Sequence, residues 1–317
     1  FEQAIAKSTA FASAHENLAM TLLQQSKHET GWMEYSWRWK NNLNSIIKRE
    51  FSEPSWNGDE LSDATLLIHS EQGFGDTIQF ARFINLIRKN HGKIILACQA
   101  ELADLLRTLP SVDRICVIGD PLPSFDYQAP LLSLPKLLKL DEQSYGTNVP
   151  YLNPPKITNK IDKSKDFLNV GICWSGRPKY RNDRHRNRSC PIEFFELVSE
   201  LAGVRLYSLQ QDEPLSDQLG FEIIETSFET FHNTAEIISQ LDLTITIDTA
   251  VTHLVGALGK PGIVLLNYTS DWRWHPGNGT SSWYPSLHMI RQNKPGDWGD
   301  VFQRLINHIR KKYQKTT

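Results

Sequence analysis

The residues best suited to chemistry follow a short apolar run. Leu243–Ile247 is apolar and β-branched, and it leads directly into Asp248, Thr249 and Ala250, where a small-residue segment with helical character begins. A strand, a turn and a helix in this order leave unpaired N–H groups at a helix N-terminus, where the helix dipole also favours negative charge. The sequence therefore predicts a phosphate site at Asp248, Thr249 and Ala250, with His253 one turn later. The alternative is that Asp248 only caps the helix.

A cationic loop after another predicted strand is the second candidate. The strand predicted over residues 168–174 is followed by Ser175 and Gly176, and residues 177–188 then hold five arginines, a lysine and a histidine against one acid. Guanidinium groups bind phosphate through paired hydrogen bonds, so one or two of these cations suffice for a diphosphate. The alternatives are a solvated loop or a nucleic-acid surface. The latter is disfavoured because Tyr180 is the one aromatic residue of the loop and the chain has a net charge of −2.

A glycine-rich turn with a carboxylate, Gly73-Phe74-Gly75-Asp76, follows the strand predicted over residues 64–69. It lacks the third glycine of the dinucleotide fingerprint, so NAD binding is rejected. As a functional group, Asp76 could accept a proton from a hydroxyl. As a structural one, it would cap the next helix. His69 and Glu71 are the next candidates for the proton acceptor.

Two further segments carry polar or aromatic groups. Ser208 and Gln210 end the strand predicted over residues 205–210 and could hydrogen-bond a ribose or a base, or belong to an ordinary polar loop. Aromatic residues then gather late in the chain, where they suit a sugar face or a base, or equally a packed loop cover. These are Tyr268, Trp272, Trp274, Trp283 and Tyr284, interleaved with Arg273 and His275.

The elements that position these groups alternate between strand and helix. With 317 residues the chain is too long for one ordinary core, and alternating βα units predict parallel sheets covered on both faces. Proline-rich residues 150–166 read as a linker. We therefore expect an α/β protein with two domains, 49–158 and 159–317, and a ligand cleft between the carboxyl ends of their sheets.

Residues 1–48 have a helical pattern instead. Similar residues recur at an offset of 34 positions, where Phe1 matches Tyr35 and Ile5 matches Trp39. A period of 34 residues is that of the tetratricopeptide repeat. Because one repeat cannot bury its own face, and because the sequence begins at Phe1, we expect further repeats upstream in a longer protein. The alternative is an unrelated helical hairpin that caps the next domain.

Composition excludes several classes of protein. No apolar stretch approaches the roughly 20 residues of a membrane span, and no segment of this sequence has the pattern of a signal peptide. Neither metal-ligand spacing, nor a nucleophile elbow, nor a P-loop occurs. The four cysteines are scattered, and three lie in or beside predicted strands, which predicts reduced thiols and a cytoplasmic location.

Taken together, the motifs resemble a known family. The Gly73-Phe74-Gly75-Asp76 turn, Trp174-Ser175-Gly176, and Asp248 to His253 with Gly259-Lys260-Pro261 are similar to the motifs of ADP-heptose:lipopolysaccharide heptosyltransferases. Gly31-Trp32, Trp37-Arg38-Trp39 and Glu71-Gln72-Gly73 bring the chain closer to bacterial proteins in which tetratricopeptide repeats precede such a domain.

The resemblance implies a GT-B fold, two Rossmann-like domains facing a cleft, with metal-independent, inverting transfer from a nucleotide sugar. It implies that Asp76 is the base, that Gln72, Gly73 and Gly75 form the acceptor-side loop, and that the turn at Asp248 contacts phosphate together with a cation, for which Arg188 is the candidate. The family's glycine is replaced by Ala250, which leaves room for close approach of the backbone. The remaining donor-side positions are Ser175, Gly176, Ser208, Gln210 and His253.

The favoured function is therefore a hexosyl- or heptosyltransferase without cofactor, acting on a hydroxyl of a protein or glycan presented by the repeats. Two alternatives differ in class. One is a non-catalytic tetratricopeptide scaffold with a degenerate nucleotide fold, which would not need to keep Asp76 and Asp248. The other is a nucleotide-sugar epimerase of the same architecture, which would require further carboxylates in the cleft.

Overall fold

The computed structural model describes residues 1–41, 46, 48–158, 160–164, 166–176, 188–211, 219–226, 229–275 and 279–313. The chain divides into two units. The first contains Phe1–Asn153 and Trp272–His275, and the second contains Pro154–Asp271 and Pro276–Thr317. The first change of unit, between Asn153 and Pro154, falls in the proline-rich stretch predicted as a linker. No described helix combines the length and the apolar character needed to cross a membrane.

The first unit begins with helices, as the sequence predicts. They are α1 (Glu2–Lys7), α2 (Ala12–Gln24), α3 (His28–Tyr35) and the 3-10 helix η1 (Ser36–Trp39). A Cβ added to Gly31 would lie 2.8 Å from Cδ2 of Leu23, so glycine allows α2 and α3 to approach closely. Their assignment to a tetratricopeptide repeat stays a prediction.

A four-stranded parallel sheet forms the rest of the first unit, in the order β3-β2-β1-β4. Its strands are β1 (Thr65–His69), β2 (Lys93–Cys98), β3 (Arg114–Val117) and β4 (Tyr127–Pro130). The helical elements between and after them are α4 (Phe74–Ala81), η2 (Arg82–Leu86), α5 (Ala100–Leu106), η3 (Leu131–Ser133), α6 (Leu134–Leu137) and η4 (Glu142–Ser144). Strand β1 lies within the strand predicted over residues 64–69, whereas β4, a short strand that ends in proline, was not predicted.

The second unit contains a six-stranded sheet in the order β6-β5-β7-β8-β10-β9, in which β9 pairs antiparallel with β10 and the other described strands pair parallel. The strands are β5 (Leu168–Cys173), β6 (Val204–Ser208), β7 (Leu243–Ile247), β8 (Gly262–Leu266), β9 (Gly279–Thr280) and β10 (Leu287–Arg291). Its helices are η5 (Ile192–Phe195), α8 (Glu196–Ser199), α9 (Phe231–Gln240), α10 (Ala250–Ala257) and α11 (Trp298–Tyr313).

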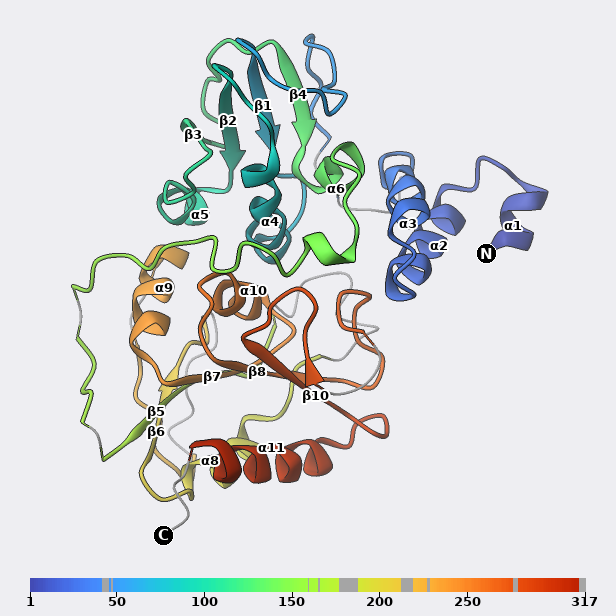
Figure 1. The fold of residues 1–317 in the computed structure, drawn as a ribbon. Coiled ribbons are helices and arrows are strands. Elements are labelled where there is room, and N and C mark those ends of the chain that lie inside the picture. Colours follow the sequence, from blue (N-terminus) through green and yellow to red (C-terminus); the bar gives the residue numbers. More distant parts are fainter. Residues whose placement is uncertain are drawn as a thin grey trace. The chain divides into compact units, whose positions relative to one another are not determined.

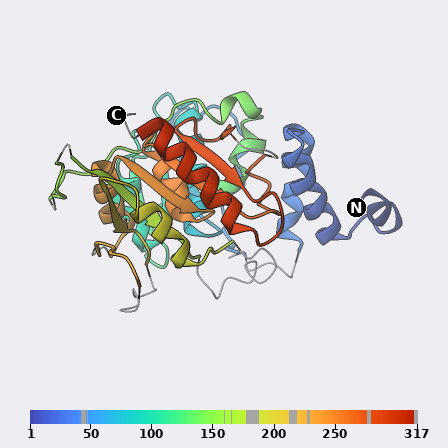
Figure 2. The ribbon, with the colours of Figure 1, turned by 90° about the horizontal axis from the view of Figure 1, so that it is seen from below.

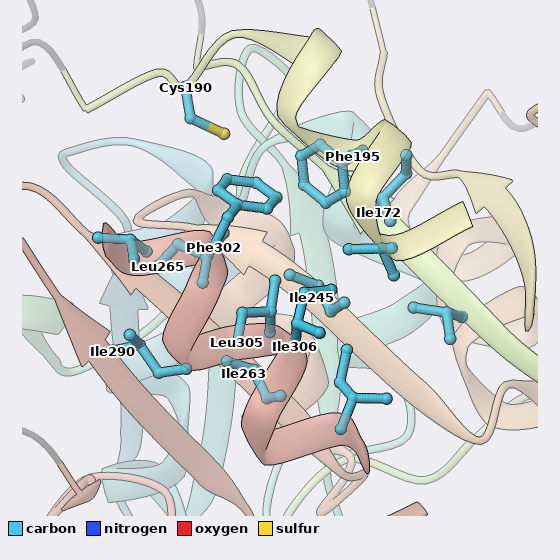
Figure 3. Close-up of a cluster of buried hydrophobic side chains, with 14 of the residues drawn as sticks. Ile172, Cys190, Phe195, Ile245, Ile263, Leu265, Ile290, Phe302, Leu305 and Ile306 are labelled. Carbon is cyan, nitrogen blue, oxygen red and sulfur yellow. The ribbon is translucent and has the colours of Figure 1, made fainter. Parts of the chain in front are cut away.

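Helices cover both faces of this second sheet. Helices α9 and α10 lie on one face, and α8 and α11 lie on the other (Figure 1). The view in Figure 2 is from the second of these faces, with α11 in front of the strands. Phe302 and Leu305 of α11 pack there against Ile245 and Ile263 of the central strands (Figure 3). Central parallel strands are buried on both faces, and all five residues of β7 are buried, four of them β-branched. Polar groups that could meet a ligand then follow at the carboxyl end of the strand.

Candidate active site

The turn between β7 and α10 has the predicted form, with one correction. The N-cap residue of α10 is Thr249, with φ −139° and ψ 175°, so Asp248 precedes the cap and the interpretation of Asp248 as the cap is wrong. Helix α10 begins at Ala250. The Thr249 hydroxyl lies 3.2 Å from the hydroxyl of Thr246, a residue buried at the end of β7. Hydroxyl groups and the first turn of a helix therefore meet at the carboxyl edge of the sheet.

Arg188 lies beside this turn. Its Nη1 donates to the carbonyl oxygen of Asp248 over 3.0 Å, although 60 residues separate the two in sequence. The structure thus brings a guanidinium group and the N-terminus of α10 together at the Asp248-Thr249 turn, and both of these groups favour an anion. The rest of the cationic loop, residues 177–187, lies outside the described residues.

Gln210 connects the loops that follow β5 and β6. Its Oε1 accepts from the backbone N–H groups of Trp174 and Ser175 over 3.2 and 2.9 Å, and its Nε2 donates to the carbonyl of Ser175 over 3.1 Å. The Ser208 hydroxyl accepts from the backbone N–H of Gln210 over 3.3 Å, and the N–H of Gly176 donates to the Ser189 hydroxyl over 3.2 Å. These contacts fix the backbone of the predicted donor loops. Whether Ser175, Gly176, Ser208 and Gln210 also contact a donor stays a prediction.

His253 lies on a packed face of α10. It is 5% exposed, and its Nδ1 lies 2.9 Å from the Tyr284 hydroxyl. The residue Gly256, one turn along, has no room for a side chain, because an added Cβ would lie 2.2 Å from Cδ1 of Tyr284. The described geometry therefore gives His253 a partner within the fold, and contact with a donor stays a prediction.

The aromatic segment mostly forms packed structure. Trp272, Trp274, Trp283 and Tyr284 are 6% exposed or less, whereas Tyr268 is 53% exposed. Of the two interpretations left open by the sequence, the packed cover fits these four residues, and an accessible aromatic face is left at Tyr268.

The glycine-rich turn places Asp76 in the first turn of α4. The N-cap is Gly73, whose φ of −69° and ψ of 172° are extended backbone, and Gly75 lies within the helix. One Asp76 oxygen, Oδ2, accepts from the N–H of Gly73 over 3.1 Å. Asp76 therefore caps the helix from its third position. The side chain remains 20% exposed, so a capping role leaves the carboxylate accessible.

The two other candidates for a base are buried and engaged. Glu71 is fully buried, and its Oε1 accepts from Nη2 of Arg38 over 2.8 Å; burial raises the pKa of its carboxyl group. Burial lowers the pKa of His69 to about 4, and its Nε2 lies 3.3 Å from Oε1 of Gln128. Asp76 is thus the one carboxylate of the three residues that reaches solvent.

Gln72 connects the acceptor-side loop to the N-terminal helices. Its Nε2 donates to the Tyr35 hydroxyl over 3.1 Å, and burial raises the pKa of Tyr35 to about 12, so this hydroxyl stays protonated. The backbone carbonyl of Gln72 accepts from Nε2 of Gln99 over 2.8 Å. Both contacts hold the loop that leads into Asp76.

One residue at this site was missed by sequence reasoning. Arg273, singled out only as a polar member of the aromatic segment, forms an ion pair with Asp76 through Nη2 and donates from Nε to Oε1 of Gln79 over 2.6 Å. Arg273 and Asp76 are 197 residues apart in the sequence, so no local sequence pattern could have paired them.

Among the described residues, no three His, Cys, Asp or Glu side chains come together as a metal site.

Comparisons with known proteins bear on the class of protein and on its fold. Residues 227–293, which include β7, α10, β8 and β10, match the model of Glycosyltransferase family 9 (heptosyltransferase). The match covers this segment of the chain only, and it supports the predicted enzyme class, a glycosyltransferase.

The relatives extend the similarity over most of the chain. Protein FlbA of Caulobacter vibrioides is 25% identical over 325 residues, which are 92% of this chain and 54% of that protein, so the chain spans about half the length of this relative. The crystal structure of the glycosyl transferase family 9 from Veillonella parvula superposes with a TM-score of 0.55 at 12% identity, over 79% of this chain and 91% of that one. This likeness shows that the α/β fold with parallel sheets is shared. The structure of E. coli ADP-heptose lps heptosyltransferase II matches with a TM-score of 0.49 at 13% identity, over 78% of this chain and 98% of that one.

Proposed function

We propose that the chain is a glycosyltransferase that moves a sugar from a nucleoside-diphosphate sugar to a hydroxyl group with inversion. The observation that carries the proposal is the meeting of Arg188, the Asp248-Thr249 turn and the start of α10 at one sheet edge. The proposal is supported by the family match over residues 227–293, which contain the Asp248-Thr249 turn and α10. A departing diphosphate gains its negative charge as the sugar leaves, and fixed cations and helix N–H groups stabilise that charge.

In the proposed reaction the acceptor oxygen attacks the anomeric carbon from the face opposite the diphosphate. The new carbon–oxygen bond forms as the bond from the anomeric carbon to the phosphate oxygen breaks, and the electron pair leaves with the diphosphate. Asp76 takes the proton of the acceptor hydroxyl, which suits an ionised carboxylate that remains partly exposed. Arg188 and the N-terminus of α10 stabilise the negative charge of the leaving diphosphate, which is the role of a metal ion in other enzymes. We therefore propose that no metal is required.

The proposal also includes the acceptor of the sugar and the cellular compartment of the enzyme. We infer a protein or glycan acceptor that is presented by the N-terminal helices, on which Phe11 and Met33 are exposed apolar side chains. All four cysteines are free, buried thiols, which suits a reducing, cytoplasmic environment.

Donor binding is the first test. Thermal shifts and calorimetry with ADP, GDP, UDP and CDP, each with and without EDTA, should identify a nucleoside diphosphate that binds equally well without divalent metal. Arg188→Ala should weaken that binding by about 1.5–3 kcal/mol if a charge-assisted contact is lost. Lys294→Ala is the matched control, because Lys294 is an exposed cation with no place in this site. Binding that disappears in EDTA would refute the metal-free mechanism.

The catalytic test uses Asp76→Asn. Asparagine still accepts the N–H of Gly73, so the helix cap and donor affinity should persist while turnover falls by roughly 100- to 10,000-fold. Turnover is measured as release of nucleoside diphosphate from ADP-, GDP- and UDP-linked sugars, with water as the hydroxyl acceptor. Asp104→Asn, on the exposed face of α5, is the control and should change nothing. Near-normal turnover by Asp76→Asn would remove Asp76 from the mechanism.

A further inference from the structure

The short segment Trp272–His275 belongs to the first unit, although its neighbours in sequence belong to the second. It is anchored there by aromatic packing. The Trp272 ring lies 5.6 Å from that of Trp32, edge to face, and 6.4 Å from that of Tyr35, both on α3. Edge-to-face aromatic pairs of this kind stabilise a defined geometry. The segment is therefore held in place by the N-terminal helices.

This packing places Arg273 against α4. Its guanidinium group lies 4.5 Å from the centre of the Trp272 ring, pairs with Oδ1 of Asp76 and donates to Gln79, which lies one turn further along α4. The planar guanidinium fork can serve both acceptors at once, which a lysine ammonium on a flexible stem cannot match. Arg273 and Asp76 are 11% and 20% exposed, so solvent screens this pair less than it would a surface pair.

The two oxygens of Asp76 are thus oriented from two directions. Oδ2 accepts from the N–H of Gly73, within its own turn, and Oδ1 faces the guanidinium of Arg273. A general base must be ionised and must point at the proton that it removes. A fixed positive charge beside the carboxylate favours the ionised form, and the two contacts together restrict rotation of the side chain.

We propose that Arg273 is a positioning residue for Asp76, holding the carboxylate ionised and aimed for proton transfer. The inference rests on the proposed function, and it gives the N-terminal helices a part in the reaction, since α3 supports the segment that carries Arg273. Arg273 acts through Asp76, so its contribution should exist only where a carboxylate is present at position 76.

The experiment is a double-mutant cycle with Arg273→Gln, Asp76→Asn and the combination, together with Arg273→Lys. Release of nucleoside diphosphate from ADP-, GDP- and UDP-linked sugars is followed across pH 5 to 9. Arg273→Gln should lower kcat about 10- to 100-fold with donor KM nearly unchanged, and Arg273→Lys should fall between Arg273→Gln and wild type. In the Asp76→Asn background, Arg273→Gln should lower kcat by less than about twofold.

The pH profile separates positioning from simple loss of structure. Without the guanidinium, the carboxylate takes up a proton more readily, so the acid limb of kcat/KM in Arg273→Gln should move to higher pH, whereas Arg273→Lys should keep it near the wild-type position. Arg107→Gln, which removes an exposed Arg–Asp pair at the C-terminal end of α5, is the control and should leave both kcat and the pH profile unchanged.

The possible results separate failure of this inference from failure of the proposed function. Equal losses in the two backgrounds, or an unshifted acid limb, would overturn the inference and leave the proposed function intact. If Arg273→Gln does not fold, Arg273→Lys with wild-type kcat and profile overturns it equally. A wild-type protein that binds none of the nucleoside diphosphates and releases none from these sugars would instead refute the proposed function itself.

Discussion

The buried ion pair between Arg38 and Glu71 provides a sharp test of how the N-terminal helices contribute to the first unit. The side chains are 1% and 0% exposed, and Nη2 of Arg38 lies 2.8 Å from Oε1 of Glu71. The same nitrogen donates to the Ser133 hydroxyl over 2.8 Å, and Nη1 donates to the carbonyl of Tyr35 over 3.2 Å. Removing the arginine would leave a carboxyl group buried without its counter-charge.

We expect Arg38→Met to lower the free energy of unfolding by about 3–5 kcal/mol, the usual cost of breaking a buried pair from one side. Glu71→Gln in the same chain should recover at least half of that loss, because the amide is neutral and its oxygen can still accept from the N–H of Leu132, 3.3 Å from the native carboxylate. Urea unfolding followed by tryptophan fluorescence measures both variants. Arg107→Met, which breaks an exposed pair, is the control and should leave the midpoint unchanged.

The pH dependence has a definite sign. Burial raises the pKa of Glu71 above its ordinary value of 4.5, so the folded state binds the proton more tightly than the unfolded state does. The stability that this provides is fully present below about pH 4.5 and is lost as pH rises through the folded-state pKa. The loss in free energy of unfolding caused by Arg38→Met should therefore be smaller near pH 4.5 than at pH 8. A loss of less than about 1 kcal/mol at pH 8, or a double variant weaker than Arg38→Met alone, would refute the reasoning.

Three further outcomes are expected. Deleting residues 1–40 should lower the melting temperature and increase binding of a hydrophobic dye, because the buried Trp32 and Tyr35 pack against Phe80 and Trp272, which the deletion would uncover; an unchanged melting curve would mean that these helices are merely tethered. Gly256→Ala should cost about 1–3 kcal/mol in thermal unfolding, because its Cβ would overlap the Tyr284 ring, whereas Gly299→Ala, 3.6 Å from its nearest neighbour, should cost nothing. Because the folded-state pKa of His69 is lowered to about 4, wild-type stability should fall as pH drops from 6.5 toward 4, and His69→Gln should flatten that slope in urea titrations.

Local patterns in the sequence predicted the elements that carry the donor-side residues. The run Leu243–Ile247 is β7, and the turn after it leads into α10, because apolar β-branched residues followed by a polar turn and small residues can form little else in a parallel sheet. The glycine-rich turn likewise ends in a helix. This helix starts at Phe74, before Asp76, because the Asp76 carboxylate caps it from its third position.

Contacts between distant segments could not be read from one sequence. Arg38 with Glu71 and Arg273 with Asp76 are separated by 33 and 197 residues, and neither pair has a local signature. Strands β4 and β10 were missed for a related reason. Tyr127–Pro130 ends in proline and His288 interrupts the apolar run of β10, so their strand conformation depends on the neighbours β1 and β8, with which they pair.

The route of the chain between the two units has a consequence for synthesis. The chain leaves the first unit after Asn153 and supplies it again only with Trp272–His275. Translation proceeds at about 5–20 residues per second, so roughly 6 to 24 seconds separate the emergence of Asn153 from that of His275. During that interval the nascent first unit lacks both the tryptophan that packs on α3 and the guanidinium that faces Asp76, so the ribosome delivers this unit's final pieces only after most of the second unit has been made.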